Sequence, residues 1–137
     1  MAHWLVKSEP FKWSWDQQVA AGKEGTFWNG VRNHSAKLNL MAMKVGEEAF
    51  FYHSNEGKEI VGIVEIIKPY YPDPSDASGT FGMVDVRAKT ALKRPVTLAA
   101  VKADPRLTDM ALVKLSRLSV QPVTEEEWAI VCALGGV

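Results

Sequence analysis

The hydrophobic and polar positions along the chain predict a block of strands in its middle. Residues 59–67 form a nearly continuous apolar run rich in isoleucine and valine, which is typical of a strand buried on both faces. Residues 49–53 and 81–88 alternate between apolar and polar side chains, as half-buried strands do. Two shorter strands are expected over residues 3–7 and 115–120. The pattern therefore predicts a sheet in which residues 59–67 form the central strand.

The predicted helices are short, and capping residues mark their starts. Ser14 with Gln17, and Thr124 with Glu127, match the capping box, in which each side chain accepts a hydrogen bond from the other residue's backbone N–H. Behind the second box an apolar stripe indicates an amphipathic helix that ends at Gly135. Two further helices are expected, over residues 35–44 and 97–103.

The order of these elements predicts the fold class. Strands dominate the middle and helices bracket them, which differs from the strand–helix alternation of a doubly wound sheet. Three prolines and a glycine within residues 68–80 predict a flexible loop that joins two of the strands. The 137 residues show no internal repeat or linker, so residues 1–137 should form one domain. We expect an α+β fold, a small and partly open barrel of strands surrounded by short helices.

Composition narrows the class of protein further. Apolar residues make up 47% of the chain and charged residues 23%, as in a folded globular domain. No apolar run approaches the roughly 18 residues of a membrane span, and the N-terminus lacks the residue order of a secretion signal. The single cysteine, Cys132, excludes an internal disulfide framework. We therefore expect a cytoplasmic protein that does not associate with membranes and is a monomer by default.

The charges of the chain balance, with 16 basic and 16 acidic residues. A net charge of zero argues against a protein that is held on nucleic acid mainly by bulk positive charge. All eight basic residues of the second half nevertheless lie between Arg87 and Arg117, where only Asp104 and Asp109 oppose them. This stretch is either a basic face or an ordinary solvated surface.

Familiar catalytic and cofactor motifs are absent from the sequence. It contains no glycine-rich phosphate loop, no G-x-S-x-G elbow, no H-E-x-x-H and no C-x-x-C. His3, His34 and His53 lack the spacing of metal ligands, so we expect neither a metal nor a cofactor. A nucleophile at Ser8 or Ser54 with His53 as its base is conceivable, but any chain of this size supplies such a pair.

Aromatic side chains beside polar ones are the more informative feature. Trp28 stands in a non-helical stretch, residues 27–33, where Asn-Gly marks a turn and nearby polar side chains supply donors and acceptors. Residues 50–55 end a strand, and alternation sends one pair of their side chains into the core and the other toward a pocket. Similar changes from apolar to polar side chains occur at residues 7–10 and 116–122. Each cluster is explained either by packing and turns or by a ligand site.

Seven segments of the chain form a recognisable set. They are Trp-Leu-Val-Lys-Ser-Glu-Pro (4–10), Trp-Asn-Gly-Val-Arg-Asn (28–33), Phe-Tyr-His-Ser-Asn (51–55), Ile-Val-Gly-Ile-Val-Glu (60–65), Val-Asp-Val-Arg (84–87), Pro-Val-Thr-Leu (95–98) and Arg-Leu-Ser-Val-Gln-Pro-Val (117–123). In this order they resemble the EVE domain family, over nearly the whole chain. The resemblance implies a PUA-like fold, a mixed-strand pseudo-barrel related to the YTH and ASCH domains.

The resemblance also implies a function and a pocket. Members of the family are thought to read modified bases in DNA or RNA, with modified cytosine as the first candidate and methylated adenine as the second. No catalytic activity is typical of the family. Trp4 departs from its usual Tyr, and Asn29 from its common Asp, which removes a charge beside the pocket. The pocket residues that carry over are Ser8, Glu9, Trp28, Val31, Arg32, Asn33, Tyr52, His53, Ser54, Arg117, Leu118 and Ser119.

Physical chemistry assigns provisional roles to these residues. A modified base must be flipped out of a duplex or taken from a single strand before a pocket can hold it. Its ring would stack on Trp28 or Tyr52, and its edge would meet Asn33 or Ser8. We place Trp28 at the rim of the pocket and outside the main core. The basic residues expected at flanking phosphates are Arg32, Arg117, Arg87, Lys89, Lys93 and Arg94.

Two other classes of function remain open from the sequence. The first is an enzyme acting on nucleic acid, a hydrolase or nuclease in which Glu9 and His53 serve as acid and base. The second is a module that binds a small molecule or a protein in the same pocket. Because the sequence contains none of the familiar catalytic motifs, we expect a binding module rather than an enzyme.

Overall fold

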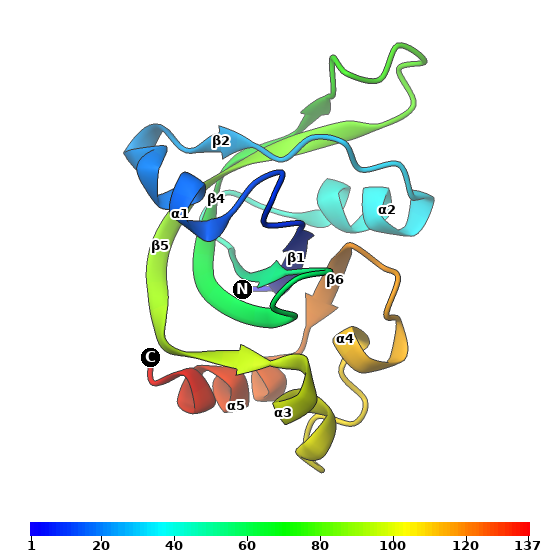
Figure 1. Cartoon of the computed structure of the whole chain (residues 1–137). Coiled ribbons are helices and arrows are strands. Elements are labelled where there is room, and N and C mark those ends of the chain that lie inside the picture. Colours follow the sequence, from blue (N-terminus) through cyan, green and yellow to red (C-terminus); the bar gives the residue numbers. More distant parts are fainter.

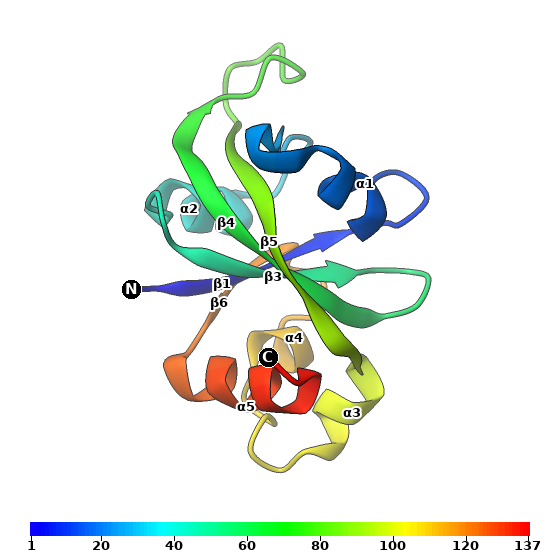
Figure 2. The same cartoon turned by 90° about the vertical axis from the view of Figure 1, so that its left-hand side faces the viewer.

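One six-stranded mixed sheet with helices on both faces makes up the structure (Figures 1 and 2), a computed structural model that describes all 137 residues. The strands are β1 (His3–Ser8), β2 (Thr26–Phe27), β3 (Glu48–His53), β4 (Glu59–Pro72), β5 (Gly82–Thr97) and β6 (Val120–Val123). The helices are α1 (Trp15–Ala20), α2 (His34–Ala42), α3 (Leu98–Ala103), α4 (Ala111–Lys114) and α5 (Glu125–Gly135), with a 3₁₀ turn, η1 (Gly22–Glu24), after α1.

The strands follow the order β2-β5-β4-β3-β1-β6 across the sheet. β4 pairs antiparallel with β5 on one side and with β3 on the other, so the prediction of a central strand over residues 59–67 is confirmed. β1 and β3 are parallel, whereas the other neighbouring pairs are antiparallel. The predicted α+β class, with mixed strands and short helices around them, is confirmed. The sheet does not close into a barrel, because β2 and β6 remain its two edges.

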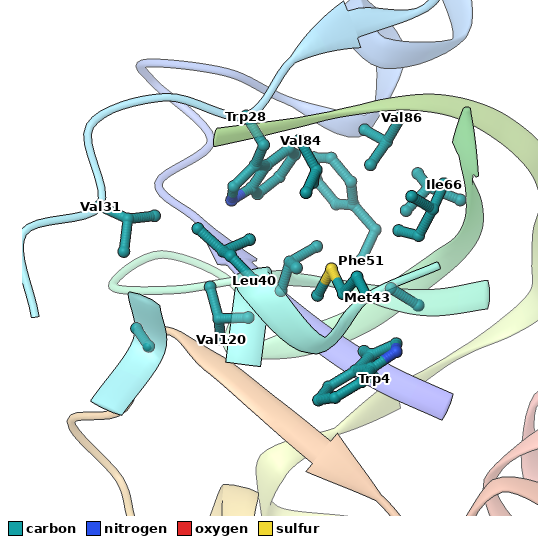
Figure 3. Packing of buried hydrophobic residues seen from close by; sticks show 14 of the residues in the cluster. Trp4, Trp28, Val31, Leu40, Met43, Phe51, Ile66, Val84, Val86 and Val120 are labelled. Carbon is teal, nitrogen blue, oxygen red and sulfur yellow. The ribbon is translucent and has the colours of Figure 1, made fainter. Parts of the chain in front are cut away.

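The sheet separates two hydrophobic cores. α1 and α2 cover one face, and α3, α4 and α5 cover the other (Figure 2). The first core contains Trp4, Val6, Trp15, Trp28, Val31, Ala36, Leu40, Met43, Ala49, Phe51, Val64, Ile66, Val84, Val86 and Val120 (Figure 3). The second core contains Leu5, Phe50, Tyr52, Ile60, Ile63, Leu92, Val96, Val101, Leu107, Met110, Leu112, Val123 and Val131.

Strand alternation explains how β3 serves both cores. Phe50 and Tyr52 face the second core, while Phe51 faces the first. Both Phe50 and Phe51 are fully buried. We expected only one of these faces to enter a core, and that expectation is wrong because helices cover both faces of the sheet.

Irregular register lets the long strands β4 and β5 pass from one core to the other. Their pairing shifts at four places, and shifts of this kind mark β-bulges that bend and twist a strand. Val84 and Val86, near the start of β5, belong to the first core, whereas Leu92 and Val96 belong to the second. The two strands curve through the whole molecule as a result (Figure 1).

The helix starts follow the local sequence. Both predicted capping boxes are present, at Ser14 with Gln17 and at Thr124 with Glu127. The helix predicted over residues 35–44 is α2, which begins one residue earlier and ends two residues earlier. None of the helices is long and apolar enough to cross a membrane.

The strand predicted over residues 115–120 is wrong. Most of it is a turn that follows α4, and the N–H of Leu115 still donates a hydrogen bond to the carbonyl of Ala111 (2.7 Å). β6 begins only at Val120. Leu118 packs against the first core from this turn.

The loop predicted over residues 68–80 is shorter than expected. β4 continues to Pro72 and pairs there with the start of β5, so the loop at the tip begins at Asp73 (Figure 1). β3 pairs with β4 only as far as Glu65. The end of β4 therefore has a strand on one side only, which is where a sheet tolerates prolines.

Candidate functional site

The largest cavity lies where the chain leaves the parallel strands β1 and β3. The two strands end side by side, and the N–H of Ser54 donates a hydrogen bond to the Ser8 carbonyl (2.9 Å). The N–H of Lys7 donates to the Ser119 carbonyl (2.9 Å), which brings the segment before β6 to the same edge. This cavity, named the Trp28 cavity, has a volume of about 610 Å³ and is lined by Lys7, Ser8, Glu9, Lys12, Trp13, Thr26, Phe27, Trp28, Asn29, Gly30, Ser54, Ser116, Arg117 and Ser119.

The structure brings half of the predicted pocket residues together. Those that line the Trp28 cavity are Ser8, Glu9, Trp28, Ser54, Arg117 and Ser119. Those that do not line it are Val31, Arg32, Asn33, Tyr52, His53 and Leu118. The expectation that one cavity collects the whole set is therefore wrong.

Trp28 belongs to the cavity and to the first core at the same time. Only 7% of its surface is exposed, and its ring meets the Phe51 ring edge to face at 5.4 Å (Figure 3). Its backbone N–H donates to the Val84 carbonyl (2.7 Å), directly after the short pairing of β2 with β5. Trp28 thus forms a wall that is continuous with the core, and its expected place at the rim is wrong.

Val31, Asn33 and Leu118 serve the framework around the cavity. Val31 is buried in the first core. The Asn33 side chain accepts a hydrogen bond from the Ala36 N–H (2.9 Å) as the N-cap of α2, so it is not free to face the Trp28 cavity. Asn33 and Leu118 instead line a cavity of about 380 Å³, named the Asn33 cavity, together with Ser35, Lys114, Leu115, Ser116 and Arg117.

Tyr52 and His53 do not line the Trp28 cavity either. Tyr52 belongs to the second core, on the opposite face of the sheet from Trp28. It lines a cavity of about 190 Å³, named the Tyr52 cavity, with Lys7, Ser54, Asn55, Lys58, Leu98, Leu112 and Ser116. His53 accepts a hydrogen bond at Nε2 from the Trp15 N–H (3.0 Å) at the start of α1.

The predicted acid–base pair is not assembled at the cavity. Glu9 lines the Trp28 cavity, whereas His53 does not. Glu9 lies near Lys12, with 3.7 Å between the carboxylate and the ammonium group. No three His, Cys, Asp or Glu side chains are grouped so that they could hold a metal ion.

Burial of His53 makes the stability of the protein depend on pH. Burial lowers the pKa of His53 below its ordinary 6.5, and the nearby Glu59 and Asp16 only partly oppose this effect. The unfolded chain therefore takes up the proton first. Above pH 6.5 both states are neutral at this residue, and stability is lost as the pH falls from 6.5 through the pKa of the folded state.

We expect a His53→Gln variant to lose this part of the pH dependence, because a glutamine oxygen can accept the Trp15 N–H bond without titrating. Urea unfolding between about pH 7 and pH 5 measures the effect. The control is His34→Gln at an exposed histidine, which should keep the wild-type profile. An unchanged profile in His53→Gln would contradict the assignment.

The Arg32 side chain forms hydrogen bonds with other residues of the protein and does not line the Trp28 cavity. Its guanidinium donates to the carboxylate of Asp73 (3.2 Å) and to the hydroxyl of Ser75 (2.9 Å). Asp73 is buried and also accepts from the Gly30 N–H (2.9 Å). The Ser75 hydroxyl (2.6 Å) and the Ser75 N–H (2.8 Å) donate to the same carboxylate. Although burial opposes ionisation, the bonds from Ser75, Gly30 and Arg32 lower the pKa of Asp73 to about 2. Asp73 therefore ties the loop after β4 to the turn that lines the Trp28 cavity, a role that the sequence did not reveal.

The cavity residues that were not among the predicted site residues are Lys7, Lys12, Trp13, Thr26, Phe27, Asn29, Gly30 and Ser116. Lys7 is half-buried, and its ammonium donates to the Ser116 carbonyl (2.7 Å). Its position at the polar end of a predicted strand was a usable signal. Trp13 offered no signal that would separate it from a tryptophan of the core.

The predicted phosphate-binding residues Arg87, Lys89, Lys93 and Arg94 do not line the Trp28 cavity. Arg87 pairs with Glu65 (2.7 Å) and Lys89 pairs with Glu48 (2.6 Å). Both line a different cavity of about 580 Å³, between α1 and the middle of β5. The basic residues at the Trp28 cavity are instead Lys7, Lys12 and Arg117.

Comparison with known protein families matches residues 2–134 to the EVE domain. The chain belongs to the EVE domain family. It is 38% identical to human thymocyte nuclear protein 1, over 97% of this chain and 73% of that protein.

Solved structures of relatives share the fold over the whole chain. Rpa0253 from Rhodopseudomonas palustris has a TM-score of 0.94 and 70% identity, and the match covers 99% of this chain and 94% of that one. The human THYN1 protein, solved in complex with DNA containing 5-methylcytosine, has a TM-score of 0.91 and 37% identity over 100% of this chain and 99% of that one.

A more distant structure confirms the PUA-like fold class. The YTH domain of the MRB1 protein from Zygosaccharomyces rouxii, solved with N6-methyladenosine RNA, has a TM-score of 0.60 and 19% identity. The match covers 98% of this chain and 86% of that one. At this identity the likeness concerns the fold alone.

Proposed function

We propose that this protein is a binding module that holds a modified base of DNA or RNA in the Trp28 cavity. The observation that carries the proposal is a cavity of about 610 Å³ lined by two indoles, Trp13 and Trp28, together with polar side chains. The related human THYN1 protein, solved with DNA containing 5-methylcytosine, supports a modified cytosine as the first candidate. Methylated adenine is the second candidate.

The shape and chemistry of the cavity suit a flat ring. Ligand cavities of about 300–1,000 Å³ enclose molecules of this size. A base stacked on an aromatic side chain gains about 1–3 kcal/mol, whatever its sequence context. Because bases are stacked inside a duplex, the base would enter from a single strand or after flipping out.

Polar groups at the cavity can read the edge of the ring. The hydroxyl of Ser8 donates to the Trp13 carbonyl (2.6 Å), so its oxygen remains able to accept from a ligand. At the cavity, the indole N–H of Trp13 donates to Gln18, whereas the indole N–H of Trp28 makes no hydrogen bond within the protein. These groups would supply the direction that stacking alone lacks.

The proposed function is binding rather than catalysis, because Glu9 and His53 do not share the cavity. A modified oligonucleotide should therefore be recovered unchanged after long incubation with the protein. We further propose that the protein acts in the cytoplasm, where its free Cys132 would remain reduced.

A pair of matched oligonucleotides with and without 5-methylcytosine tests the proposal. Enclosing one methyl group contributes about 0.8 kcal/mol, so the methylated strand should bind roughly fourfold more tightly. Phe27→Ala should weaken binding to both strands, because this ring lines the cavity and is 54% exposed, so its removal leaves both cores intact.

Phe11→Ala is the matched control for this variant. Phe11 is 64% exposed and does not line the Trp28 cavity. Fluorescence anisotropy of a labelled oligonucleotide measures the affinity of the wild type and of the two variants. Equal binding of methylated and unmethylated strands by the wild type, or equal effects of the two phenylalanine variants, would contradict the proposal.

A further inference from the structure

Asn29 and Gly30 form the only asparagine–glycine pair of the chain. Both residues are exposed, and neither belongs to a helix or a strand. Asn29 lines the Trp28 cavity, and its side-chain amide makes no hydrogen bond with another residue. This pair therefore combines an unrestrained amide with a neighbour that has no side chain.

An asparagine before a glycine can lose its side-chain nitrogen without an enzyme, and asparagine is one of the thermolabile residues of proteins. The backbone nitrogen of the glycine attacks Cγ of the asparagine and forms a new N–Cγ bond. The side-chain nitrogen leaves as ammonia, with the proton of the attacking N–H. Water then opens the five-membered succinimide at either of its two carbonyls. The product is aspartate, or isoaspartate in which the main chain runs through Cγ.

The surroundings of Gly30 leave room for this attack. Its φ is +80°, and a Cβ placed on it would meet no atom within 4 Å. Because glycine carries no side chain, nothing shields its backbone nitrogen from the preceding residue. Asn55 is exposed as well, but the larger Glu56 follows it. Asn29 is thus the asparagine of this chain that is best suited to cyclise.

The N–H of Gly30 is nevertheless held by a hydrogen bond in the folded protein. It donates to Oδ2 of Asp73 (2.9 Å), whose carboxylate is fully buried. Arg32 and Ser75 donate to the same carboxylate and keep it in place. Since the pKa of Asp73 is lowered to about 2, this carboxylate is too weak a base to take the Gly30 proton. Its charge also opposes a second negative charge on the adjacent nitrogen.

We propose that Asn29 is a deamidation site, and that the hydrogen bond from Gly30 to Asp73 protects it in the folded protein. Breaking this bond frees the Gly30 nitrogen to attack Asn29. The inference does not depend on which ligand the Trp28 cavity binds. Deamidation adds a carboxylate to a cavity whose lining contains one, that of Glu9, and no step of the reaction restores the amide.

Mass spectrometry of the whole protein, incubated in warm and mildly alkaline buffer and then digested, tests the proposal. Trypsin releases residues 24–32, in which Asn29 is the only asparagine, and residues 45–58, in which Asn55 is the only one. Wild type unfolded in guanidinium chloride should deamidate at Asn29 at least about tenfold faster than the folded protein. This fold-change corresponds to the loss of one hydrogen bond to a charged group. Asn55 should remain largely intact in both samples.

Two substitutions of Asp73 test its role in the folded protein. Asp73→Ala should deamidate at Asn29 about tenfold faster than the wild type. Asp73→Asn should lie between the two, because the introduced amide oxygen accepts the Gly30 N–H without a charge. Pro74 follows this position, so the introduced amide has no neighbouring N–H with which to cyclise.

Val131→Ala is the matched control for the loss of stability. Val131 is fully buried in the second core, so its truncation destabilises the protein and leaves the bond between Gly30 and Asp73 intact. This variant should deamidate at the wild-type rate. If Asp73→Ala does not fold, the comparison of Asp73→Asn with Val131→Ala decides.

Equal rates at Asn29 in folded and unfolded wild type, or in the wild type and both Asp73 variants, would overturn the inference. Acceleration by Val131→Ala equal to that by the Asp73 variants would also overturn it, because global unfolding would then explain the rates. The product should be a mixture of aspartate and isoaspartate. Aspartate alone would exclude the succinimide and with it the proposed attack by Gly30.

Discussion

Replacing Trp28 by alanine is expected to lower the free energy of unfolding by about 3–5 kcal/mol. The side chain is 7% exposed and packs against Phe51 within the first core, so its removal leaves a large hole. Surrounding residues come from β3, β4 and β5 and cannot all move inward to fill it. Urea unfolding of the purified variant measures the loss.

A Trp28→Phe variant separates the structural role of Trp28 from recognition. Phenylalanine keeps a ring against Phe51, so stability should fall clearly less than with alanine. It removes the free indole N–H and narrows the stacking surface, so affinity for a methylated oligonucleotide should still fall. Should Trp28→Ala unfold at the wild-type urea concentration, Trp28 would not be part of the core.

Replacing Asp73 by alanine is expected to cost about 2 kcal/mol at neutral pH. The carboxylate is fully buried, and its pKa is about 2 in the folded protein against an ordinary 3.8. Each unit of difference corresponds to about 1.4 kcal/mol of stability. Because the folded state favours the ionised form, this contribution is present above about pH 4 and is lost as the pH falls toward 2.

The wild type and the Asp73→Ala variant should therefore converge in stability at low pH. Asp109→Ala is the control, because Asp109 is exposed and pairs only with Lys114, so its loss should cost at most about 1 kcal/mol. Asp73→Ala should also weaken oligonucleotide binding, since it releases the Gly30 N–H beside the Trp28 cavity. A stability difference that persists unchanged at low pH would contradict the assigned pKa.

Local signals in the sequence were sufficient for many of the elements. The capping boxes at Ser14 and Thr124 depend on residues three positions apart, and both form as predicted. The apolar run over residues 59–67 became the central strand, and helices over both faces of the sheet bury its side chains in the two cores. Errors arose at residues 68–80 and 115–120, where sheet pairing and helix ends depend on segments distant in the sequence.

The candidate site was only partly predictable. Ser8 and Ser54 meet because β1 and β3 are parallel and end together, and Ser119 reaches the same edge because β6 runs antiparallel to β1. Asn33 and His53 carry the right chemistry for a ligand, but they form hydrogen bonds with backbone N–H groups at the starts of α2 and α1. The Asn33 Oδ1 and the His53 Nε2 therefore already have a partner within the protein.

The sequence by itself determined the helix caps, the central strand, the α+β class and the likeness to the EVE family. These depend on neighbouring residues, on periodicity and on motif order, all of which are present in the chain before it folds. Only the tertiary structure decided that Trp28 is a core residue as well as a cavity wall, that Arg32 binds the buried Asp73, and that Lys7 lines the Trp28 cavity without an ion pair. Burial and hydrogen-bond partners are properties of the surroundings in space, and residues far apart in the sequence supply those surroundings.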